Sequence, residues 1–174
     1  MTTWTRHLYE HDPLAIAKGE SNNYEPRNIF GYNALVGPSY IPCWENNTAY
    51  TQPTTGLAMT VAANVADDGV VIRLIGLDVN YEVIAENITL NSAVPPTTTL
   101  QFFRINDVVT VAGNALNDIT VTNGGITYAK IRGGEGKNQA SIYTVPAGYS
   151  FYLMRIDAFC ATAAQNNRQI YFRN

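Results

Sequence analysis

The feature that most constrains the fold is a succession of short apolar runs, separated by turn-forming residues, that begins at Leu57. The runs are rich in β-branched and aromatic residues, which favour strands. They cover residues 57–65, 70–77, 81–90, 99–105, 108–112, 118–122, 126–132, 140–145, 150–161 and 169–173. Between them lie Gly, Pro, Asn and Asp, as in the Asn123-Gly124 pair that is typical of a hairpin. Because no window of helical length separates the runs, we predict an all-β domain, an antiparallel β-sandwich or a jelly-roll-like barrel.

The run at residues 150–161 shows the alternation expected of a half-buried strand. One of its faces contains Arg155 and Asp157. The other face has no charge and comprises Tyr152, Met154, Ile156, Ala158 and Cys160. Since successive side chains of a strand point to opposite sides of the sheet, we expect the uncharged face to point into the core.

The first 55 residues differ in composition from the rest of the chain. They contain five of the eight prolines, both tryptophans and both histidines. Proline removes a hydrogen-bond donor and biases the residue before it to extended geometry, so a long helix or a central strand is not expected here. We predict an extended, ordered N-terminal arm at residues 1–55, with a short helical turn at residues 13–18, followed by the β-sandwich domain at residues 56–174. The aromatic side chains of the arm are expected to pack on the domain or on a neighbouring subunit.

Charge and hydropathy limit the classes of partner. Charged residues make up 14% of the chain, well below the usual quarter, and the net charge is −3. Without a basic stripe, nucleic acid and anionic membranes are poor partners, and no apolar run approaches the ~20 residues that span a bilayer. The N-terminal residues lack the apolar stretch of a signal peptide, so we expect synthesis in the cytoplasm. The low charge favours a surface that neighbouring subunits partly cover.

The sequence offers no convincing catalytic or metal-binding group. His7 and His11 would bring two imidazoles to one face of a helix, but no third ligand accompanies them, and we expect a polar arm without metal. Both histidines lie in the arm, so a serine or cysteine nucleophile in the β domain has no histidine base nearby in sequence. We therefore expect a protein that is not an enzyme, has no catalytic residues and needs no cofactor.

Two further motifs are expected to be turns. Residues 133–138 read Gly-Gly-Glu-Gly-Lys-Asn, but a phosphate loop has Ser or Thr after its lysine and then a helix. Asp67, Asp68 and Asp78 lack the spacing of a calcium-binding loop. The two cysteines, Cys43 and Cys160, are expected to be buried thiols, although a disulfide between them stays open.

A series of strand-and-turn motifs between residues 40 and 160 is more specific than the composition. It includes Cys43-Trp-Glu-Asn46, Gly76-Leu-Asp-Val-Asn-Tyr81, Thr89-Leu-Asn91, the threonine run Thr97–Thr99, and Tyr143-Thr-Val-Pro-Ala-Gly148. In these motifs the chain resembles a group of virion structural proteins of tailed bacteriophages, common among aquatic and cyanobacterial phages. The resemblance implies a part of the virion, and it suggests a capsid decoration, or cement, protein on the head surface.

That resemblance implies the major capsid protein as a partner, together with self-association as a homo-oligomer, for which a trimer suits the three-fold sites of a shell. Aromatic and arginine side chains are the usual anchors of such interfaces. The expected interface residues are Trp4, Tyr9, Tyr24, Arg27, Phe30, Tyr32, Tyr40, Trp44, Tyr171 and Phe172. Packing within the chain is the alternative for each of them. Two other functions stay open: a tail, baseplate or fibre component, and a glycan-binding module for attachment to a host.

Overall fold

The computed structural model describes residues 16, 18, 24–35 and 42–159 of the chain. The contacts divide the chain into two units. Residues 27–149 form one unit, here called the sandwich unit, and residues 1–26 together with residues 150–174 form the other, here called the terminal unit.

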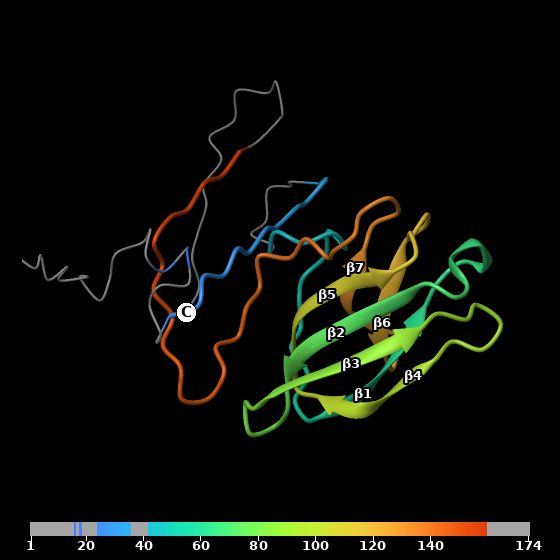
Figure 1. The fold of residues 1–174 in the computed structure, drawn as a ribbon, viewed down its shortest axis with the longest axis horizontal. Coiled ribbons are helices and arrows are strands. Elements are labelled where there is room, and N and C mark those ends of the chain that lie inside the picture. The colour runs from blue at the N-terminus through green and yellow to red at the C-terminus, as the bar shows by residue number, and fades with distance from the viewer. Residues whose placement is uncertain (1–15, 17, 19–23, 36–41, 160–174) are drawn as a thin grey trace, which may run out of the picture. The chain divides into compact units, whose positions relative to one another are not determined.

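The described residues of the sandwich unit form seven strands in two antiparallel sheets, as predicted for an all-β fold (Figure 1). Their bounds are β1 (Leu57–Ala62), β2 (Val71–Leu77), β3 (Val83–Thr89), β4 (Thr97–Phe102), β5 (Arg104–Ala112), β6 (Ile119–Asn123) and β7 (Ile126–Ile131), with a 3-10 turn, η1 (Val65–Asp67), after β1. One sheet has the order β4-β1-β6-β7 and the other the order β3-β2-β5. Of the two predicted architectures, the β-sandwich and the jelly-roll-like barrel, the described residues form the β-sandwich.

The two sheets enclose one hydrophobic core between them. Alternation along the strands produces it: in β2, Ile72 and Leu74 are buried whereas Arg73 is exposed. The side chains that are at most 1% exposed in the core cluster are Met59, Val61, Ile72, Leu74, Phe102, Val108, Ile119, Val121 and Ile131. Such burial stabilises the fold by about 1.5–3 kcal/mol per large side chain, so this core holds the sheets together.

Close packing around Gly76 joins β2 to β5. The register of this pair shifts between Ile75 and Gly76. A Cβ atom at Gly76 would overlap the carbonyl oxygen of Arg104 and would lie 2.8 Å from Cδ1 of Phe102. Glycine is therefore required here by the approach of another backbone.

The predicted strand at residues 140–145 is wrong, because this stretch follows the edge of β5 without forming a regular ladder. The backbone N–H of Thr110 donates to the carbonyl oxygen of Gly136 at 2.8 Å. Farther along, the side chain of Asn106 donates to the carbonyl oxygen of Thr144 at 2.7 Å and accepts from its N–H at 2.8 Å. A side-chain amide thus replaces the backbone partner that a strand would need.

The predicted strand at residues 150–161 is also wrong over its described part, since residues 150–159 form no strand. Its expected core face is exposed: Tyr152 by 60%, Met154 by 61% and Ile156 by 43%. Alternation describes a pleated surface that another element can cover, but it does not say which element supplies the cover. The run at residues 169–173 lies outside the described residues.

Within the sandwich unit, the chain ahead of β1 contacts the stretch at residues 139–141. The N–H of Tyr32 donates to the carbonyl oxygen of Gln139 at 3.1 Å, and the N–H of Ser141 donates to that of Cys43 at 2.8 Å. A Cβ at Gly31 would lie 2.6 Å from the oxygen of Cys43, so the approach is tight. Most of residues 1–23 lie outside the described residues, and the division into an arm at 1–55 and a domain at 56–174 stays a prediction.

Candidate functional site

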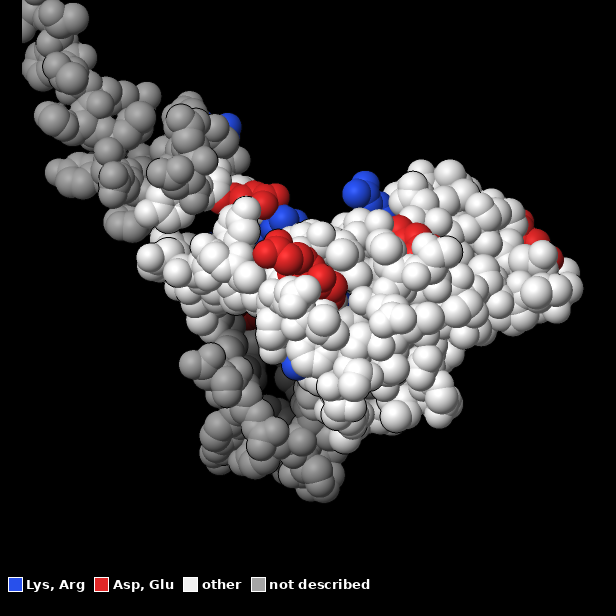
Figure 2. Space-filling view, turned by 90° about the horizontal axis from the view of Figure 1, so that it is seen from below, with Lys and Arg blue, Asp and Glu red and all other residues white. Residues whose placement is uncertain are grey.

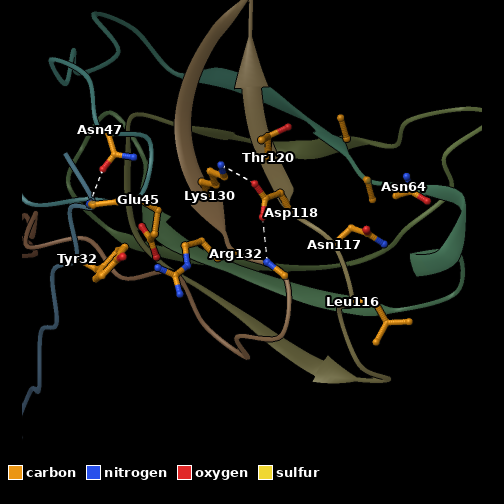
Figure 3. Close-up of a pocket in the computed structure, with 14 residues that line it drawn as sticks. Tyr32, Glu45, Asn47, Asn64, Leu116, Asn117, Asp118, Thr120, Lys130 and Arg132 are labelled. Carbon is orange, nitrogen blue, oxygen red and sulfur yellow. Dashed lines mark hydrogen bonds and ion pairs between the residues drawn. The ribbon is translucent and has the colours of Figure 1, made fainter.

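The sandwich unit has an open pocket of about 750 Å³ beside β6 and β7. Its lining comes from the segment before β1, the end of β1 with the two residues after it, the loop before β6, and β6 and β7 with the two residues after β7. The lining residues are Tyr32, Ala34, Glu45, Asn47, Ala62, Ala63, Asn64, Leu116, Asn117, Asp118, Thr120, Lys130, Arg132 and Gly133. Figure 3 shows Asn47, Glu45 and Tyr32 toward one end and Asn64, Asn117 and Leu116 toward the other. The charged residues Lys130, Asp118 and Arg132 lie between them.

An ion pair fixes the middle of the pocket. Nζ of Lys130 lies 2.6 Å from Oδ2 of Asp118, and the backbone N–H of Gly133 donates to Oδ1 at 3.0 Å (Figure 3). The hydrogen bond from Lys130, followed by that from Gly133, lowers the pKa of Asp118 below its usual value. Asp118 therefore stays ionised at neutral pH and balances the charge of Lys130.

Arg132 is held between a ring and a carboxylate. Its Cζ lies 4.2 Å from the centroid of the Tyr32 ring, within the range of a cation–π contact. Its Nη2 lies 3.3 Å from Oε1 of Glu135. These two contacts orient the guanidinium at the pocket wall and match its charge with a nearby acid.

Glu45 is a buried carboxyl at the edge of this pocket. The residue is 3% exposed, its Oε1 accepts the N–H of Gln139, and its Oε2 has no hydrogen-bond partner among the described residues. Desolvation raises the pKa of Glu45 to about 7, although its own backbone N–H and the charges of Arg132 and Lys130 oppose the rise. The carboxyl therefore titrates near neutral pH, and it links the loop at residues 42–48 to the chain at Gln139.

Several polar side chains around the pocket have hydrogen-bonding capacity to spare. Oδ1 of Asn47 accepts the N–H of Ala34 at 2.8 Å, and Oδ1 of Asn64 accepts the N–H of Ala66 at 3.1 Å. The Nδ2 groups of both residues, and the side chain of Asn117, form no hydrogen bond with the described residues. An asparagine amide offers two N–H donors, so the pocket is equipped to bind a ligand.

The described lining residues include no serine, cysteine or histidine. In the described part of the chain, no three residues among His, Cys, Asp and Glu are grouped as metal ligands. The candidate metal ligands His7 and His11 lie outside the described residues.

The expected interface residues have different environments. Trp44 is only 1% exposed: its ring meets that of Tyr50 edge-on at 4.9 Å, and its Nε1 donates to the carbonyl oxygen of Thr48 at 2.7 Å. Its packing is therefore within the sandwich unit, the alternative that the sequence left open. Burial also raises the pKa of Tyr50 to about 12.

The remaining interface residues that can be placed are at least partly exposed. Phe30 is 65% exposed, Tyr32 is 37% exposed and Arg27 is exposed. Tyr24 is half-buried, and its ring lies 6.3 Å from that of Tyr152 in the terminal unit. Outside the described residues are Trp4, Tyr9, Tyr40, Tyr171 and Phe172.

Cysteine burial differs from expectation. Cys43 is exposed with a free thiol, so the expectation of a buried thiol is wrong for this residue. Its carbonyl oxygen accepts the N–H of Ser141 at 2.8 Å. Cys160 lies outside the described residues.

A run of exposed apolar side chains at residues 149–159, here called the apolar run, was missed as a surface because its alternation predicted a core strand. Its large exposed members are Tyr149 (73%), Phe151 (47%), Tyr152 (60%), Leu153 (56%), Met154 (61%), Ile156 (43%) and Phe159 (92%). The space-filling view also shows few charged side chains among the described residues on the face it presents (Figure 2). The exposed ion pair of Arg155 and Asp157 lies within the run. Exposed apolar surface is typical of sites that interact with other molecules.

Comparisons with family models, curated proteins and solved structures found no match to this chain. Among the described residues, no helix has both the length and the apolar character to cross a bilayer. Function is therefore inferred from the pocket, the apolar run and the sequence motifs.

Proposed function

We propose that the protein is a capsid decoration, or cement, protein that attaches to the outer surface of a phage head and stabilises contacts between capsomers. The observation that carries the proposal is the apolar run, in which residues as apolar as Leu153 and Phe159 are exposed by 56% and 92%. Exposed apolar groups of this size are costly in water and are covered when a partner binds.

The gain from covering the run is large enough to hold a subunit on a shell. Burying a Phe, Leu or Met side chain contributes about 1.5–3 kcal/mol, so several together exceed the cost of ordering one segment. The alternation of residues 150–159 also suits addition to the edge of a sheet in a partner, in which backbone hydrogen bonds supply affinity and alternate side chains enter pockets.

The sequence motifs suggest the identity of the partner. Their resemblance to tailed-phage virion proteins supports the major capsid protein as the shell partner. It also supports a second contact with copies of the same chain, as a trimer at three-fold sites. The charged content of 14% supports a surface that is covered in the assembly, because few charges need to be desolvated.

Quantitative mass spectrometry and cryo-microscopy of particles that carry the chain test this proposal. Hundreds of copies per particle, placed on the head, are the expected result. A dozen copies or fewer, placed in the tail, baseplate or fibres, would replace it with the tail alternative. Absence of the chain from purified particles would refute both.

Variants of the apolar run locate the attachment surface. The double substitution Leu153→Asp with Met154→Asp should abolish binding to shells that lack the protein. Val94→Asp is the matched control, since Val94 is 71% exposed and lies in the sandwich unit. Equal loss of binding in both variants would show that any new exposed charge interferes and that the run is not the contact.

A further inference from the structure

We propose that the pocket beside β6 and β7 is a binding site for a sugar residue of a neutral glycan. This site is separate from the apolar run, and it does not depend on the proposed role in a capsid. Its volume of about 750 Å³ falls within the ~300–1,000 Å³ of typical ligand pockets, and it accommodates a hexose and part of its neighbour.

Hydrogen-bonding capacity is the first reason for a sugar. Asn47 and Asn64 are each fixed by a backbone N–H that donates to Oδ1, so their Nδ2 groups remain as oriented donors. Asn117 adds both an acceptor and a donor, and the hydroxyl of Thr120 can act as either. Sugar hydroxyls likewise donate and accept, so a polyol satisfies this mixed set where a purely apolar ligand leaves it unpaired.

Charge balance is the second reason, and it favours a neutral ligand. The charge of Lys130 is matched by Asp118 at 2.6 Å, and that of Arg132 by Glu135 at 3.3 Å. No excess cation is left in the pocket to offset the desolvation of an anionic ligand. The carboxylate of Asp118 and the guanidinium of Arg132 remain charged, and both can form hydrogen bonds with neutral hydroxyls.

An apolar surface for the C–H face of a sugar ring is the third reason. The ring of Tyr32 is 37% exposed, and Leu116 is 65% exposed at the opposite end of the pocket. Ala62 and Ala63 contribute small side chains at the end of β1, which leave space for the ligand. Amides, paired charges and an aromatic ring around an open hollow match the amphipathic surface of a hexose.

The test uses the full chain, labelled with ¹⁵N and titrated in NMR experiments with single sugars. The probes are the methyl glycosides of glucose, galactose and mannose, free N-acetylglucosamine, and methyl glucuronide as the acidic counterpart. At least one neutral probe should produce saturable shifts centred on Asn117, Thr120 and Arg132. A dissociation constant of about 1 mM is expected for a single residue in an open pocket.

Variants make the assignment specific. Asn117→Ala and Arg132→Ala should each weaken binding of that probe about tenfold, which corresponds to ~1.4 kcal/mol. Asn87→Ala and Arg73→Ala are matched controls, because both residues are exposed in β3 and β2 and line no part of the pocket, and they should bind unchanged. The backbone N–H of Asn117 keeps its bond to Asp67 in Asn117→Ala, so this variant decides the matter if Arg132→Ala does not fold.

Three results would overturn the proposal. The first is the absence of saturable shifts with every neutral probe up to about 50 mM, well above the expected dissociation constant. The second is binding of the glucuronide alone, which would reassign the pocket to acidic ligands. The third is a shift map that centres elsewhere, or binding that Asn117→Ala leaves unchanged.

Discussion

The strands of the sandwich unit and the apolar run have similar sequences but different environments. In β6, which pairs with β1 and β7, Ile119 and Val121 alternate with threonines and are at most 1% exposed, because their face of the strand packs into the core between the sheets. In residues 150–159 an equally regular alternation produces no strand, and Phe159 is 92% exposed. Alternation thus indicates a segment that fits into a β-sheet, but the neighbouring strands have to come from the same chain or from another one.

The largest expected effect concerns the tight contact inside the sandwich. Gly76→Ala should destabilise the protein by on the order of 4 kcal/mol or more, because the new Cβ overlaps the carbonyl oxygen of Arg104 and forces β2 away from β5. Gly136→Ala is the control, since a Cβ there meets nothing within 4 Å. Chemical denaturation measures the free energy of unfolding of both variants. Similar stability of the two variants would mean that β2 and β5 are not packed as described.

The next effect tests whether the segment before β1 belongs to the sandwich. Trp44→Ala should cost about 3–4 kcal/mol and lower Tm by about 10 °C, because it empties a buried site next to Tyr50. Phe30→Ala, at a side chain that is 65% exposed, should change Tm by less than about 2 °C. If Trp44→Ala and Phe30→Ala have the same Tm, Trp44 does not stabilise the sandwich unit. The N-terminal arm predicted from the sequence would then include this residue.

A smaller effect comes from the buried carboxyl that joins the segment to the unit. The folded pKa of Glu45, about 7, lies above its ordinary value, so the folded state retains a proton that the unfolded state has lost. Its contribution to stability is complete in acid and is lost as the pH rises through about 7. Between pH 5.5 and 8, Tm should fall by a few degrees, a change of about 1 kcal/mol after allowance for solvent screening.

Glu45→Gln separates this effect from other titrations, because an amide still accepts the N–H of Gln139 but does not ionise. Melting curves of the variant should be nearly independent of pH over the same range. Asp118 does not interfere, since its pKa is lowered and its contribution is lost only in more acidic solution. If the fall of Tm with rising pH is as large in Glu45→Gln as in the wild type, another group causes the pH dependence.

The sequence predicted the fold well where each strand finds its partner nearby. The runs at residues 70–77 and 126–132 coincide within a residue with β2 and β7, because turn signals such as Asn123-Gly124 mark their ends. The stretch at residues 140–145 was mispredicted because the amide of Asn106 occupies its ladder position, and no local pattern shows that contact.

The pocket could not be predicted from the sequence either. Its polar groups are distant in sequence, as Asn47 and Asn117 illustrate, and only the pairing of β1, β6 and β7 brings them together. The aromatic signal of the arm led to both Trp44 and Tyr32, but it did not show that Trp44 is buried whereas Tyr32 lines the pocket. The signal available in advance was the density of asparagines in turns, which does not distinguish a turn from a ligand site.

The central claim is that the apolar run binds a partner and does not hold the sandwich together. Thermal unfolding of the Leu153→Asp and Met154→Asp double variant, followed by circular dichroism, is measured beside its binding to shells that lack the protein. We predict a Tm within about 2 °C of the wild type and a loss of shell binding, since both side chains are more than half exposed. A fall in Tm as large as that of Trp44→Ala, with shell binding unchanged, would show instead that the run is part of the folded core.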